Sequence, residues 1–162
     1  MDFSVISDNL TYFMIGRYPH GPLGGIGLTL YLAAVSCVLS FAGGIVLALL
    51  SRSRFRALGY LANTYIHVMR GVPLLMVIFW MYFLLPALVG HPVAENWTVI
   101  TALSAFTSAY MSQIVRAGID SVPKGQTEAA LSTGLSPRQA MLYVVLPQGL
   151  LVLGRLDDSR FT

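Results

Sequence analysis

The sequence predicts an all-α, polytopic bundle of transmembrane helices. Of the 162 residues, 56% are hydrophobic and only 10% are charged, and the mean hydropathy is +0.70. Soluble domains carry about 25% charged residues. Long apolar runs without charge alternate with short segments that hold most of the arginines. Because a bilayer takes the place of a water-excluding core, such runs indicate helices that cross a membrane.

Four stretches are expected to be spans, since a helical span needs about 20 apolar residues. They lie at residues 23–50, 58–89, 97–116 and 139–154, within a transmembrane domain over 21–154. Arg70 and Pro73 interrupt the second stretch, and Pro73 is expected to kink it or to begin its transmembrane part afresh. The fourth is short for a span.

Both ends of the first span carry further signals. Phe3, Ile6, Leu10, Phe13 and Met14 recur at helical spacing, so the segment 1–20 is expected to be periplasmic or interfacial and to include an amphipathic helix. The pair Gly43-Gly44 is a candidate contact face with a neighbouring helix, although simple helix flexibility is an equal alternative.

The basic residues predict the orientation of the spans. Arginines follow the first span, and further basic residues follow the third: Arg52, Arg54, Arg56, Arg116, Lys124 and Arg138. The loop 86–97 holds Glu95 and no Lys or Arg. We therefore expect the N-terminus outside and the loop 117–138 in the cytoplasm, with Arg17 opposing this weakly.

Several function classes are not expected. The net charge is +3 with a pI near 9.2, but the basic residues lie beside apolar runs and not among aromatic ones, which argues against nucleic-acid binding. No paired carboxylates, activated nucleophile or phosphate-binding loop is visible, so an enzyme is not expected. His20, His67 and His91 are isolated, and Cys37 is expected to be a buried, inert thiol with no metal partners.

The loop between the third and fourth stretches carries a more specific pattern. Residues 126–133 suit a short helix after Pro123, and Gly134 suits a left-handed C-cap. Ser136 is then expected to cap a second helix, with Pro137 as its first residue and Gln139 completing a capping box. The simpler alternative is an ordinary loop between two spans.

Such a pair of helices makes a rigid knob that another protein can grip. Ala129 and Ala130 are expected to leave a smooth face for close approach, and Glu128 offers an acidic contact on that face.

The spacing of this stretch resembles the EAA loop of permease subunits of bacterial ABC importers. It reads Glu128-Ala129-Ala130, three residues, Gly134, nine residues, Val144, one residue, Leu146-Pro147, with Val144 in place of isoleucine. Further segments resemble the polar amino-acid branch of that family. They are residues 21–30, 70–75, 122–126 and 146–148, and the likeness runs in register over about residues 8–150.

The resemblance implies a MetI-like, type I importer permease that moves polar or charged amino acids across the bacterial inner membrane. Such a permease binds no cofactor and hydrolyses nothing, because ATP and Mg²⁺ bind a separate ABC ATPase subunit. A second permease subunit, identical or a sister, completes the pathway within the membrane lipid. A periplasmic amino-acid-binding protein delivers the substrate.

The same resemblance assigns roles to individual residues. Those expected to couple to the ATPase, directly or as support, are Glu128, Ala129, Ala130, Gly134, Lys124, Gly125 and Gln126. Those expected in the pathway or its gate are Arg70, Gly71, Pro73, Tyr110, Gln113 and Arg116. Arg70 either lines the pathway and attracts a carboxylate, or lies near the inner surface and snorkels.

One pathway position departs from the family pattern Ala-Tyr-x-x-Glu-x-x-Arg. Ala109, Tyr110 and Arg116 match, but Gln113 stands where the acid belongs. A Glu–Arg pair there is expected to be reduced to a neutral hydrogen bond.

The last residues also depart from the family. The fourth stretch reaches about 16 residues before Arg155, the tail 155–162 is charged, and the fifth span that the family has is not seen. A truncated or frame-shifted product is therefore expected. Two alternatives stay open: a transport-incompetent fragment that still inserts and docks the ATPase, and a small channel or secondary carrier.

Overall fold

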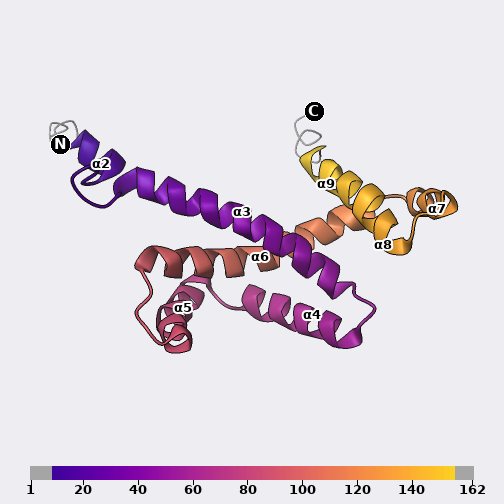
Figure 1. Ribbon diagram of the computed structural model, residues 1–162, viewed down its shortest axis with the longest axis horizontal. Helices are drawn as coiled ribbons and strands as arrows, with labels where there is room; N and C mark the ends of the chain where they lie inside the picture. The colour runs from indigo at the N-terminus through magenta and orange to yellow at the C-terminus, as the bar shows by residue number, and fades with distance from the viewer. Residues whose placement is uncertain (1–8, 156–162) are drawn as a thin grey trace.

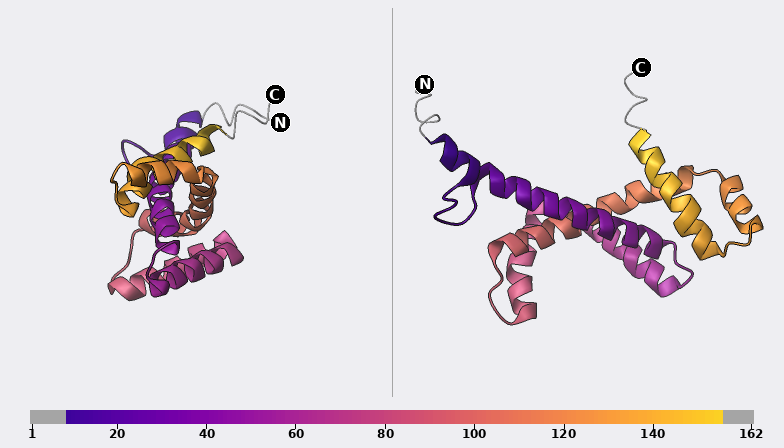
Figure 2. Two further views of the ribbon diagram at one scale, coloured as in Figure 1. Left: turned by 90° about the vertical axis from the view of Figure 1, so that its right-hand side faces the viewer. Right: turned by 45° about the horizontal axis from the view of Figure 1, so that its top comes forward.

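The computed structural model describes residues 9–155, and its regular elements there are helices. Two helices of 27 residues, α3 (Gly25–Ser51) and α6 (Glu95–Ser121), cross near their middles (Figures 1 and 2). At 1.5 Å per residue each is about 40 Å long, enough for a hydrocarbon layer of about 30 Å. By length and composition, both are candidate membrane spans.

Small residues allow α3 and α6 to approach closely. A Cβ on Gly44 would lie 2.7 Å from the Cβ of Met111, and one on Gly43 would lie 3.1 Å from the Cβ of Ser108. Side chains larger than hydrogen would push the helices apart, which is how small residues serve helix packing in membranes. The contact face predicted at Gly43-Gly44 is thus confirmed.

The second apolar stretch is not one straight helix. It forms α4 (Arg56–Gly71) and α5 (Leu74–Val89), which are bent by 114°. Val72 is extended, with φ −111° and ψ 139°, because the ring of Pro73 disfavours a helical conformation in the residue before it. The break predicted at Pro73 is confirmed, and the span predicted over 58–89 stays a prediction, with this bent pair as the segment that would form it.

Helix α6 is the centre of the fold, because it packs against α3, α4, α5 and α9 (Leu146–Arg155). It runs five residues beyond the predicted end at Arg116. No helix-breaking residue occurs until Pro123, which turns Val122 to an extended conformation. The first part of the predicted loop 117–138 is therefore still helical.

The chain then forms a group of short helices at one end of the molecule: α7 (Lys124–Ser132), α8 (Pro137–Ala140), the π-helix η1 (Met141–Val145) and α9. Helices α8, η1 and α9 follow one another without a break, with helical backbone at Met141 and Leu146 where they join. The fourth span at 139–154 stays a prediction, because this stretch is not among the candidate spans found in the described residues. A buried cluster joins this group to α3 and α6. Its members are Ala48, Val115, Ile119, Val122 and Val145.

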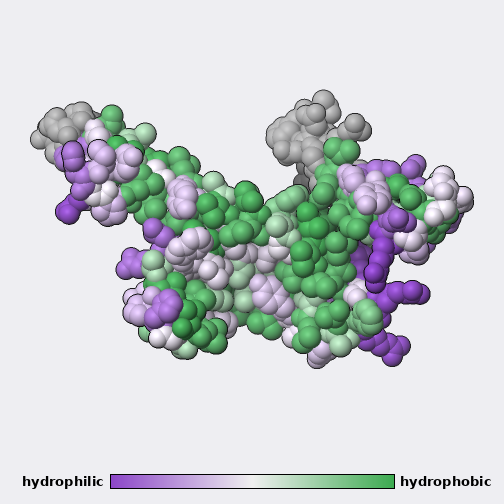
Figure 3. Space-filling model, viewed as in Figure 1, coloured by the Kyte–Doolittle hydropathy of each residue, from purple (hydrophilic) through white to green (hydrophobic). Residues whose placement is uncertain are grey.

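Much of the remaining apolar surface faces outward, as expected for a chain surrounded by lipid. On α5 only Val77 is buried, and Figure 3 shows a broad hydrophobic area over the middle of the molecule. Cys37 is exposed on α3, so the prediction of a buried thiol is wrong. Because α3 carries no charged residue on any side, the sequence does not show which face of the helix Cys37 occupies.

The predictions for the two ends of the chain fall only partly within the described residues. Helix α2 (Leu10–Ile15) agrees with part of the predicted amphipathic helix, while Phe3 and Ile6 lie outside the described residues. The charged tail predicted at 155–162 also lies outside them, apart from Arg155 at the end of α9.

Candidate functional site

The segment predicted as a knob is two short helices joined at a glycine. Gly134 lies just beyond α7 and has a φ of +89°, the left-handed region that glycine adopts most readily. Its N–H donates to the carbonyl of Leu131 at 3.0 Å. A Cβ at this position would meet nothing within 4 Å, so the glycine is required by backbone conformation and not by space. The left-handed conformation predicted for Gly134 is confirmed, one residue beyond Thr133, which is the C-cap of α7.

A capping box fixes the start of α8. The N–H of Ser136 donates to Oε1 of Gln139 at 2.9 Å, and the N–H of Gln139 donates to Oγ of Ser136 at 3.4 Å. Two backbone donors without partners in the helix are thereby satisfied, as predicted. Since both helix ends are held by specific contacts, the knob has a defined shape.

The predicted coupling residues divide into exposed and buried ones. The exposed ones are Lys124, Gly125, Gln126, Glu128, Ala129 and Gly134. Ala130 is only 6% exposed, because one residue along a helix turns the side chain by about 100° and α7 packs against η1. The smooth face predicted for both alanines therefore holds for Ala129 only, and Ala130 attaches the knob to its own chain.

Two contacts tie the knob to the long helices. Nε2 of Gln148 donates to Oε1 of Gln126 at 3.3 Å, which joins α7 to α9. A Cβ on Gly149 would lie 2.9 Å from the backbone of Gly118, so α9 lies directly against α6. Sequence reasoning placed Gln126 and Gln148 in separate motifs and missed their pairing, because no periodicity links residues that meet across a turn.

The pathway candidates near the bend come together. The guanidinium carbon of Arg70 lies 5.6 Å from the centre of the Tyr110 ring, and the Tyr110 hydroxyl donates to the carbonyl of Arg70 at 3.4 Å. Gly71 and Pro73 follow directly and are exposed, as is Arg70. A cation over an aromatic ring at an exposed site is worth about 0.5–1 kcal/mol. The arrangement leaves the charge of Arg70 available to a ligand.

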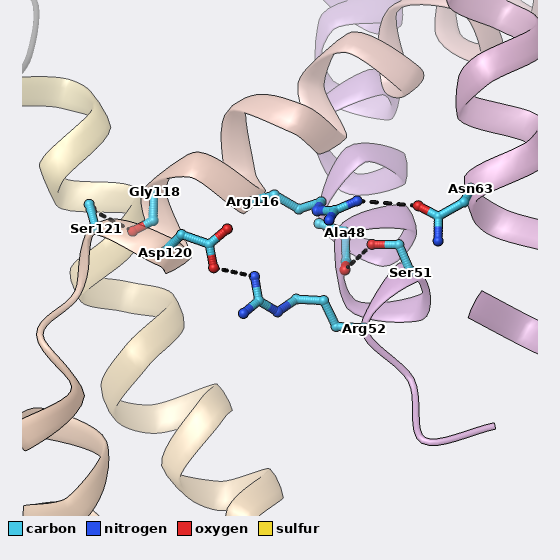
Figure 4. Close-up of polar contacts among 8 residues, drawn as sticks. All are labelled: Ala48, Ser51, Arg52, Asn63, Arg116, Gly118, Asp120 and Ser121. Carbon is cyan, nitrogen blue, oxygen red and sulfur yellow. Dashed lines mark hydrogen bonds and ion pairs between the residues drawn. The ribbon is translucent and has the colours of Figure 1, made fainter. Parts of the chain in front are cut away.

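The remaining candidates do not pair as expected. Arg116 donates from Nη1 to Oδ1 of Asn63 on α4 at 3.2 Å (Figure 4). Asn63 in turn donates to the carbonyl of Gly59 at 2.8 Å. Within the described residues the side chain of Gln113 makes no hydrogen bond, so the neutral Gln–Arg bond predicted here is absent. Residues three apart on one helix share a face, but Arg116 extends across to the neighbouring helix.

An ion pair links the C-terminal ends of α3 and α6, a contact that the sequence did not predict. Nη1 of Arg52, the residue directly after α3, lies 2.5 Å from Oδ1 of Asp120 in the last turn of α6 (Figure 4). The side chains are 36% and 56% exposed. The pair holds the ends of α3 and α6 together beside the knob.

Metal binding has no support in the part of the chain that the structure describes. No group of three or more His, Cys, Asp or Glu side chains there is placed to hold a metal ion. That ATP and Mg²⁺ bind a separate subunit stays a prediction.

Comparisons with known proteins give matches along most of the chain. Residues 40–153 match the family model of the binding-protein-dependent transport system inner membrane component. The chain is 40% identical over 126 residues to the arginine transport system permease protein ArtQ of Bacillus subtilis, covering 78% of this chain and 58% of that protein. It is 33% identical over 154 residues to the glutamate/aspartate import permease protein GltK of Escherichia coli, covering 91% of this chain and 65% of that one.

A solved structure agrees as well. The chain matches the crystal structure of an amino acid ABC transporter with histidines at 31% identity and a TM-score of 0.75, covering 96% of this chain and 70% of that one. The chain spans 58–65% of the length of ArtQ and GltK. The match of the family model to most of the chain decides its classification. The chain belongs to the family of binding-protein-dependent transport system inner membrane components.

Proposed function

We propose that this chain is the membrane-spanning permease subunit of an ATP-driven importer of polar or charged amino acids. The observation that carries the proposal is the capped helix pair of α7 and α8. Glu128 and Ala129 stand exposed on it, while Ala130 anchors it to the rest of the chain. Relatives with 33–40% identity bear names of arginine and glutamate/aspartate permeases, which supports the substrate class.

The proposal implies a division of labour among subunits. An ABC ATPase subunit binds ATP and Mg²⁺ and grips the exposed face of α7. A second permease subunit, identical or a sister, forms the other half of the pathway, and a periplasmic amino-acid-binding protein delivers the substrate. This chain supplies the path and the mechanical link.

The contacts provide a route for the mechanical link. A displacement of α7 acts on α9 through the Gln126–Gln148 hydrogen bond, and α9 lies against α6 at Gly149. The Arg52–Asp120 pair then carries the movement to the end of α3. Because α6 packs against α3, α4, α5 and α9, a push at the knob reaches every long helix.

The orientation that the proposal requires places the knob in the cytoplasm and the N-terminus outside. Support comes from charge, since the end of α3, the start of α4 and the short helices α7 and α8 lie at one end of the molecule (Figure 1). The basic residues of that end are Arg52, Arg54, Arg56, Lys124 and Arg138. Cytoplasmic segments of membrane proteins carry such an excess of Lys and Arg.

The bend between α4 and α5 is the proposed place of substrate contact. Arg70 is exposed there with its guanidinium over Tyr110, and a carboxylate is the natural partner of a guanidinium. Gly71 and Pro73 lie directly beside it and shape the bend. On this proposal Gln113 and Arg116 lie away from the substrate, since Arg116 is held by Asn63.

Capture of the ATPase tests the proposal most directly. The chain is co-purified with its cognate ATPase subunit and permease partner, and the retained ATPase is measured for the variant Ala129→Trp. Bulk on the exposed face of α7 is expected to reduce capture at least tenfold. In proteoliposomes the same variant is expected to lose ATP-dependent uptake of glutamine, glutamate or arginine.

A matched control is Ala57→Trp, since Ala57 is also exposed and lies in the first turn of α4 at the same end. It is expected to retain the ATPase. Full capture by the Ala129 variant, or substrate flux without ATP in the parent protein, would contradict the proposal and favour a channel or secondary carrier.

A further inference from the structure

A groove of about 580 Å³ opens where α3 ends, where the loop to α4 begins and where α8 meets η1. Its walls combine two kinds of residue. Arg52, Arg54 and Arg138 line it together with apolar side chains that include Leu50, Met141 and Leu142, and no acidic residue among residues 9–155 lines it. In Figure 3 hydrophilic residues gather at this end beside the hydrophobic surface. The groove therefore has a cationic part and an apolar part.

The charges of the groove are not all neutralised within the chain. Arg52 is paired with Asp120. Arg54 and Arg138 are exposed, and among residues 9–155 neither side chain has a hydrogen bond or an ion pair. Two guanidinium groups from segments more than 80 residues apart thus border one groove without an internal partner. An anion would pair with these two guanidinium groups, and a phosphate accepts several hydrogen bonds from such groups.

We propose that this groove is a binding site for one anionic phospholipid. The phosphate lies between Arg54 and Arg138, and an acyl chain follows Leu50, Met141 and Leu142 along the ends of the spans. Basic pockets between transmembrane helices are the kind of site that holds anionic headgroups. A free phosphate would satisfy the arginines but would leave the apolar wall in water, and for that reason we commit to the lipid.

The bound lipid has a structural consequence. Arg54 belongs to the α3–α4 loop, and Arg138 lies in α8, one of the two helices of the knob. A phosphate shared between them ties the ends of the first two long elements to the knob. Placement in the cytoplasmic leaflet rests on the orientation proposed above, but binding itself does not, so the two fail independently.

The test measures lipid retained by the full chain after purification in detergent. The protein is incubated with phosphatidylglycerol or phosphatidylcholine, and bound lipid is counted by native mass spectrometry. We expect one phosphatidylglycerol to be retained in preference to phosphatidylcholine. Arg54→Gln and Arg138→Gln are each expected to lower its affinity roughly fivefold, the effect of about one basic residue near a lipid surface.

Arg56→Gln is the matched control, because Arg56 belongs to the same loop region but does not line the groove. It is expected to change affinity less than twofold. Equal losses for Arg54 and Arg56 would overturn the site in favour of general attraction by surface charge. Thermal unfolding of each variant checks that the fold is kept.

Two further arms separate the lipid from other occupants. The variant Leu142→Ser is expected to bind phosphatidylglycerol more weakly. Inorganic phosphate at millimolar concentration is expected not to displace the bound lipid from the parent protein. Displacement by phosphate alone, with no effect of Leu142→Ser, would mean a simple anion site and would overturn the proposal. So would unchanged lipid binding in the Arg54 and Arg138 variants together with loss of ATPase capture, since the groove would then belong to that protein.

Discussion

Arg116 of α6 donates its hydrogen bond to Asn63 of α4, across the helix interface, and not to Gln113 three residues before it on its own helix. Nδ2 of Asn63 in turn donates a hydrogen bond to the carbonyl of Gly59. The side-chain oxygen of Asn63 therefore accepts a hydrogen bond from α6, and its side-chain nitrogen donates one within α4. This one side chain fixes how α4 lies against α6 near a partly buried charge.

We predict that Asn63→Leu destabilises the protein by about 1–3 kcal/mol, because the partly buried guanidinium of Arg116 loses its partner. Asn63→Asp keeps an acceptor for Arg116 and loses only the bond to Gly59, so it is expected to cost less. Thermal unfolding of the two variants in detergent gives the order. A leucine variant as stable as the parent would mean that Arg116 is satisfied elsewhere.

This contact marks the limit of what the sequence predicts. Motif spacing placed Tyr110 and Arg116 on one helix and Arg70 near a bend, because helical periodicity and proline act over a few residues. The Arg70–Tyr110 contact and the Asn63–Arg116 bond join residues 40 and 53 positions apart. Such pairs depend on the packing of α4 against α6, which no local pattern encodes.

The predictions that depend on neighbouring residues were the reliable ones. The left-handed Gly134 and the capping box at Ser136 were predicted because caps are decided by neighbouring residues. The burial of Ala130 was missed for the opposite reason, since α7 packs against η1 only after the chain has turned back.

Close packing of α3 on α6 predicts a cost for side chains at Gly44. We expect Gly44→Val to destabilise by about 1–3 kcal/mol, the usual range for overpacking, because even a Cβ would lie 2.7 Å from Met111. Gly71→Ala serves as a control for stability alone, since a Cβ there meets nothing within 4 Å. Unfolding midpoints that shift equally for the two variants would contradict the close approach.

Gly134 is expected to respond to conformation and not to size. Gly134→Val should cost about 1–2 kcal/mol, because an L side chain with φ near +89° is strained. Gly134→Asn should cost less, since asparagine tolerates this region. Amide hydrogen exchange over 124–140 measures the effect locally. Equal protection in the valine and asparagine variants would show that the turn adopts another conformation.

The Arg52–Asp120 pair is expected to add little to stability, because its side chains are 36% and 56% exposed. Pairs of this kind contribute about 0–1 kcal/mol and weaken with salt. Asp120→Asn should therefore lower the unfolding midpoint slightly, and less so in high salt. Exchange of the two charges in one double variant should recover part of the loss. A large effect that salt does not change would indicate a buried role.

The Gln126–Gln148 bond predicts a separation of ATPase binding from transport, if the chain acts as proposed. Gln148→Ala removes the bond between α7 and α9 but leaves the exposed face of Glu128 and Ala129 unchanged. ATPase capture should then stay within twofold of the parent, while substrate moved per ATP hydrolysed falls several-fold in proteoliposomes. Gln126→Ala should behave alike, and the double variant should be no worse than either single one, because both remove the same bond. Additive losses would mean that each glutamine acts through a separate contact and that force reaches α6 through the packing of α7 on η1, whose Val145 lies in the buried cluster with Val115 and Ile119 of α6.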